Sequence, residues 1–175
     1  MATNTTPKMV KRCQRVAFMN TDTTGSTPKY DRMTKFSSLS NSKNPKEYSR
    51  QYVDQEFEES DVVGYAPSIS YYFDRHTNTP VHEMIAKIHD GEMTGTETLV
   101  DIVVIDLFDP VGSADGTTYT ARKRTWAVIP DADGDGNDAL VYTGSFKSKS
   151  PVETGTATLS PDGKTLTYKA PSEAY

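Results

Sequence analysis

Two short stretches of the sequence carry residues that could bind a metal ion. In the first, Asp131, Asp133 and Asp135 alternate with small residues and are followed by Gly136. This spacing is typical of the first half of an EF-hand calcium loop, whose twelfth position supplies a bidentate Glu. Here that position is Tyr142. Because the flanking segments have the pattern of strands, we interpret the stretch as a solvated hairpin turn, with weak calcium binding as the alternative.

The second stretch is His82-Glu83, which resembles the start of a zinc-protease motif. That motif needs a second His four residues after the first, so that both face one metal ion. Position 86 is Ala, and His89 lies seven residues after His82. We therefore predict no metal site here and interpret both His residues as lying on a helix surface.

The sequence contains none of the usual catalytic constellations. It has no Gly-rich phosphate loop and no G-x-S-x-G elbow, and its single cysteine, Cys13, has no neighbouring His or second Cys to activate it. Acidic pairs such as Glu58 and Glu59 stand in a run of like charge without an apolar pocket to raise one pKa. We expect a protein that is not an enzyme and that needs no cofactor.

Length and composition are typical of one globular domain. The chain has 175 residues, and one cysteine excludes an intrachain disulfide. The first residues lack the apolar stretch of a secretory signal, and no run approaches the roughly 18 apolar residues of a membrane span. These features indicate synthesis in the cytoplasm and no membrane partner.

Charge is segregated along the chain, although the net charge is only −5. Residues 1–50 carry a net charge of +7, residues 51–119 carry −12, and the remainder is neutral. Two interpretations remain open. Opposite faces could meet between subunits, since complementary potentials steer association, or basic and acidic strands could pair within one sheet.

The expected fold is mainly β, an antiparallel β-sandwich or barrel with one flanking helix at about residues 80–90. There Val81, Met84, Ile85 and Ile88 recur at helical spacing between Pro80 and Gly91. The strands alternate apolar and polar residues or are rich in β-branched ones. We expect a flexible arm over residues 1–14, one domain over 15–170 and a tail over 171–175.

A long polar hairpin is expected at about residues 33–60. Its two arms, 33–42 and 48–57, are separated by a turn at 41–45 that contains Asn44-Pro45. A hairpin this polar cannot dock along its whole length on a core, so we expect it to project.

Three short segments resemble the major tail tube proteins of long-tailed bacteriophages and of phage-tail-like bacteriocins. They are FSSL at 36–39, NPKEYSRQYVD at 44–54 and VGYAPSISY at 63–71. The resemblance implies a virion protein that forms hexameric rings, stacked into a tail tube that conducts DNA during ejection. It implies that the hairpin makes contacts between subunits, through residues that include Asn44, Pro45, Lys46, Tyr48, Arg50, Tyr52 and Asp54.

The resemblance also implies partners. These are further copies of the chain and other tail proteins such as the tape measure and the tail terminator, while DNA passes through without specific binding. An acidic lumen would repel the phosphate backbone, and the candidate lumen acids are Asp54, Glu56, Glu58, Glu59 and Asp61. The alternative is a secreted or particle-attached binding or decoration module, stabilised by calcium at Asp131, Asp133 and Asp135.

Overall fold

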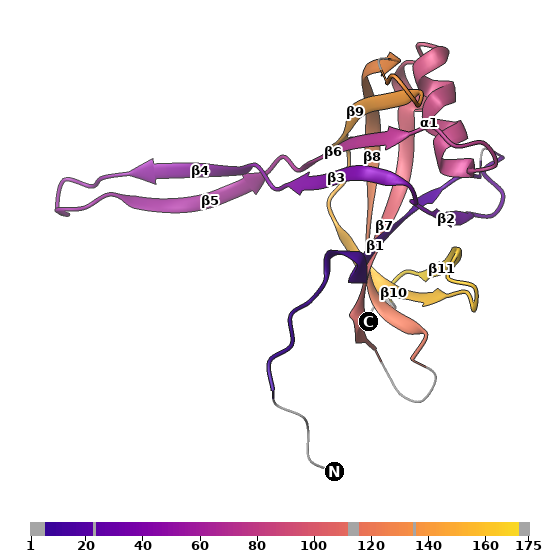
Figure 1. Ribbon diagram of the computed structural model, residues 1–175. Helices are drawn as coiled ribbons and strands as arrows, with labels where there is room; N and C mark the ends of the chain where they lie inside the picture. The colour runs from indigo at the N-terminus through magenta and orange to yellow at the C-terminus, as the bar shows by residue number, and fades with distance from the viewer. Residues whose placement is uncertain (1–5, 23, 112–115, 135, 172–175) are drawn as a thin grey trace. The chain divides into compact units, whose positions relative to one another are not determined.

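A computed structural model describes residues 6–22, 24–111, 116–134 and 136–171 (Figure 1). The chain is mainly β and has one α-helix, α1 (Pro80–Asp90), which confirms the predicted fold class. Two 3₁₀ turns, η1 (Arg12–Gln14) and η2 (Gly95–Thr98), are also present. The strands are β1 (Arg15–Asn20), β2 (Tyr30–Arg32), β3 (Phe36–Ser42), β4 (Pro45–Arg50), β5 (Glu59–Tyr65), β6 (Ser68–Asp74), β7 (Leu99–Pro110), β8 (Thr118–Gly134), β9 (Val141–Ser148), β10 (Glu153–Leu159) and β11 (Thr165–Lys169).

The chain forms two compact units. The first, the barrel unit, takes its described residues from Met1–Met33, Ile102–Lys123 and Val152–Tyr175, and the second, the helix unit, comprises Thr34–Asp101 and Arg124–Pro151. Strands β7 and β8 run through both. The prediction of one domain over 15–170 stays a prediction.

Six strands of the barrel unit close on themselves. The order of neighbours is β10, β11, β2, β1, β7 and β8, and β8 pairs in turn with β10. Closure leaves none of these strands with a free edge. Alternate residues point inward, and the interior is filled by Val16, Phe18, Tyr30, Val103, Ile105, Tyr119, Ala121, Ala157 and Leu166.

The helix unit packs α1 against an antiparallel sheet in the order β8, β9, β6, β3. Pro80 occupies the first turn of the helix and Gly91 its C-cap, as predicted from the sequence. Val81, Ile85 and Ile88 are buried, as their spacing predicts. In the described part of the chain no helix is both long and apolar enough to cross a membrane.

The predicted hairpin exists, but its arms pair differently from the sequence expectation. Strands β3 and β4 follow one another on one side of the hairpin, and β5 and β6 follow one another on the other side (Figure 1). The register runs from Phe36 opposite Phe73 to Arg50 opposite Glu59. The chain reverses at residues 51–58, and the expected turn at 41–45 is wrong. Asn44 instead interrupts one arm: it has a φ of 44°, and its carbonyl accepts a hydrogen bond from the Ala66 amide opposite.

Candidate assembly interface

Strands β4 and β5 form a two-stranded sheet of their own, which we call the hairpin arm together with the tip at residues 51–58. A sheet of two strands has no core and is marginally stable alone in water. Every residue of β4 is exposed, as is all of β5 except Gly64. The arm therefore has the character of a segment that gains its packing from a partner.

Large apolar side chains of the hairpin arm lie in solvent. Val53 is fully exposed, Phe57 is 71% exposed, and Val63 and Tyr65 are 65% and 63% exposed. Scattered apolar residues on a surface are ordinary, but several on one thin element mark an interaction site. The arm therefore offers apolar contact area as well as charge.

The register divides the arm into two faces. Tyr48 lies opposite Asp61 and Arg50 opposite Glu59 on one face, where the Arg50 guanidinium donates a 2.9 Å hydrogen bond to the Tyr48 hydroxyl. On the other face the hydroxyl oxygens of Ser49 and Ser60 are hydrogen-bonded at 2.6 Å. One face is therefore charged and the other largely neutral.

The predicted lumen acids gather around the tip. Asp54, Glu56 and Glu58 belong to the tip, and Glu59 and Asp61 begin β5. All five side chains are exposed. Of the predicted assembly residues, Pro45, Lys46, Tyr48 and Arg50 lie on β4, whereas Tyr52 and Asp54 lie in the tip and so do not share one strand face with them.

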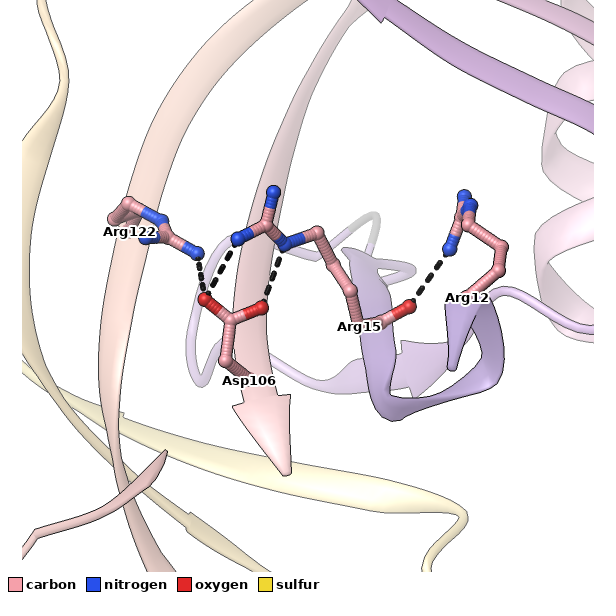
Figure 2. A network of polar contacts seen from close by, with 4 residues as sticks. All are labelled: Arg12, Arg15, Asp106 and Arg122. Carbon is pink, nitrogen blue, oxygen red and sulfur yellow. Dashed lines mark hydrogen bonds and ion pairs between the residues drawn. The ribbon is translucent and has the colours of Figure 1, made fainter. Parts of the chain in front are cut away.

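The barrel unit holds a charged cluster that the sequence did not predict. Asp106, on β7, lies opposite Arg15 on β1. Its carboxylate accepts hydrogen bonds of 2.6 and 3.0 Å from Arg15 Nε and a terminal nitrogen, and one of 2.5 Å from Arg122 on β8 (Figure 2). The bidentate hydrogen bond from Arg15 is the main cause that lowers the pKa of Asp106. The signal in the sequence was an acid between the apolar residues Ile105 and Leu107, because a buried acid requires a counter-charge.

Two arginines bind this one carboxylate. The Asp106 side chain is only 12% exposed, whereas those of Arg15 and Arg122 are 55% and 40% exposed. Arg12, in the preceding 3₁₀ turn, donates to the Arg15 carbonyl at 2.9 Å (Figure 2). We call the exposed residues Lys11, Arg12, Arg15 and Arg122 the arginine patch.

Two of the three candidate calcium ligands lie in a strand. Asp131 and Asp133 lie within β8, which continues to Gly134, and the ladder to β9 is shifted by a bulge between Pro130 and Ala132. The hairpin turn expected from Asp131 onward therefore begins later than predicted. Asp135 lies outside the described residues. Among the residues described, no group of three His, Cys, Asp or Glu side chains is arranged to hold a metal ion.

The histidines of α1 are buried, so their predicted surface position is wrong. His82 is fully buried: its Nδ1 accepts the His76 amide at 3.1 Å, and its Nε2 donates to the Thr34 carbonyl at 2.9 Å. His89 Nε2 lies 2.7 Å from the Tyr71 hydroxyl. Burial lowers the pKa of both imidazoles. Their hydrogen bonds connect α1 to Thr34, His76 and Tyr71, which is a structural role.

No protein-family model and no curated protein matches the sequence. Solved structures do match. A chain from the tail of an empty GTA particle, determined with helical refinement and C6 symmetry, superposes with a TM-score of 0.55 at 13% identity, covering 82% of this chain and 97% of that one. A chain of the anti-feeding prophage (AFP) baseplate, from a sixfold-symmetrised cryo-EM structure, gives a TM-score of 0.47 at 13% identity, covering 86% and 96%. The chain therefore shares its fold with a protein of a particle tail.

Proposed function

We propose that the chain is a structural subunit of a viral or virus-like tail, and that its copies assemble into stacked hexameric rings forming a tube for DNA. The observation that carries this proposal is the fold likeness to a GTA tail chain, which extends over 97% of that chain in a structure with C6 symmetry. Tape-measure and tail-terminator proteins are the further partners proposed.

The hairpin arm supports the same proposal. It combines exposed apolar residues, exposed charges and only two strands, features that are costly for a monomer and useful at an interface. Contacts between subunits would bury the apolar side chains and complete the packing that the arm lacks. We assign the arm the role of the main assembly element.

Negative-stain microscopy and light scattering on the purified full chain test the proposal. Rings or tubes with sixfold symmetry are expected. A protein that remains monomeric across concentration and salt contradicts it. Calcium titration during thermal unfolding tests the alternative, because a ligand that binds only the folded state raises the melting temperature.

The register supplies a clean deletion of the arm. Pro45 lies directly opposite Tyr65, so residues 46–64 can be replaced by Asn-Gly, the dipeptide that favours a two-residue hairpin turn. This variant should keep its secondary structure and lose assembly. Glu83→Ala, an exposed change on α1, is the control that should still assemble. Normal assembly by the deleted protein would exclude the arm from this role.

A further inference from the structure

The tip of the hairpin arm carries uncompensated negative charge. No Lys or Arg occurs between Arg50 and Arg75 in the sequence. Within the described residues none of the five carboxylates of the tip and early β5 forms an ion pair, and only Glu59 accepts a side-chain hydrogen bond, from Gln55 at 2.8 Å. Like charges at neighbouring positions of the chain repel one another, so a cationic partner would relieve the repulsion.

The arginine patch is the complementary surface. Asp106 holds the guanidinium groups of Arg15 and Arg122 in fixed orientations, while both side chains stay well exposed. A guanidinium has five N–H donors, and Asp106 takes two from Arg15 and one from Arg122. Ordered arginines with remaining donors are well suited to bind carboxylates, because little side-chain entropy remains to be lost.

We propose that the acidic tip of one copy docks on the arginine patch of a second copy. This inference rests on the proposed function and identifies which two surfaces of the subunit meet. Carboxylates such as Glu56 and Glu58 face Lys11 and Arg12, and the exposed side chains of Val53 and Phe57 add apolar contact around the charges.

The second copy is the favoured occupant because the two surfaces have opposite charge on one chain. Every subunit then offers one donor surface and one acceptor surface, a heterologous contact that propagates from copy to copy. The attraction between exposed charges is screened by salt, so assembly should weaken as ionic strength rises.

A charge swap tests the docking. The tip variant Glu56→Lys/Glu58→Lys and the patch variant Lys11→Glu/Arg12→Glu should each need a protein concentration at least roughly tenfold higher to assemble, because like charges then face each other. The chain carrying all four changes should assemble as the natural protein does. An equimolar mixture of the two variants should also assemble, since each supplies the surface that the other requires.

Matched controls separate this inference from the proposed function. Glu83→Lys/Glu97→Lys changes two exposed acids of the helix unit by the same total charge and should assemble normally. Lys11→Glu alone is a second patch variant that leaves Arg12 in place, and circular dichroism checks the folding of each. If the natural protein assembles but the tip variant assembles equally well, or the four-change chain is not restored, the docking is wrong. If the natural protein never assembles, the proposed function fails.

Discussion

Replacing Asp106 with Asn removes the charge that holds two arginines together. The amide keeps the shape of the side chain and can still accept a hydrogen bond, but its NH₂ group faces guanidinium donors. Arg15 and Arg122 then carry two positive charges on neighbouring strands with no carboxylate between them. We expect the variant to fold and to be less stable.

The structure sets the size of the loss. A hydrogen bond to a charged group contributes about 1.5–3 kcal/mol when buried. Asp106 is nearly buried, but Arg15 and Arg122 are more than a third exposed, so solvent screening reduces each interaction toward the 0–1 kcal/mol of a surface pair. The expected sum is about 2 kcal/mol, which for a chain of this length lowers the melting temperature by about 4–8 °C.

The effect has a defined pH dependence. Because the pKa of Asp106 is lowered in the folded protein, its contribution is complete above the ordinary Asp pKa of about 3.9 and is lost as the pH falls through the folded-state pKa. Thermal unfolding of Asp106→Asn and the natural protein, measured from pH 7 to pH 2.5 below the assembly concentration, should show a difference that closes in acid. Asp109→Asn, an exposed change on the same strand, is the control. A loss below 0.5 kcal/mol, or a difference independent of pH, would refute the reasoning.

Three further predictions address the helix unit. Burial lowers the pKa of His82, so as the pH falls below about 6.5 this imidazole is protonated in the unfolded chain before it is protonated in the folded protein. Urea unfolding should therefore show a lower unfolding free energy at pH 5.5 than at pH 7.5. An NMR titration that gives the His82 imidazole a pKa at or above about 6.5 would contradict this. Gly144→Ala places a Cβ 2.5 Å from the Ile129 carbonyl oxygen and should cost about 1–3 kcal/mol in unfolding free energy. Val53→Ser/Phe57→Ser should leave the melting temperature nearly unchanged, because both side chains are exposed, yet reduce assembly in sedimentation assays; unchanged assembly would remove them from the interface.

Local patterns in the sequence were sufficient for the helix and for most strands. The apolar spacing of Val81, Ile85 and Ile88, with Pro80 and Gly91 at the ends, predicts α1 with its observed bounds. These signals depend on neighbours within one or two turns, so no distant contact is needed to interpret them. The acidity of residues 51–61 likewise belongs to composition alone.

The sequence by itself thus determined the mainly β class, the single helix and the charged hairpin, because each rests on the order of nearby residues. Only the tertiary structure decided where the hairpin turns, since Asn44-Pro45 is a good local turn signal that the ladder between β3 and β6 overrides. Only the tertiary structure buried His82 and placed Asp106 between two arginines. Those outcomes depend on residues such as Thr34, 48 positions from His82, and Arg15, 91 positions from Asp106. Strand pairing brings such partners together, and no spacing along the chain reveals it.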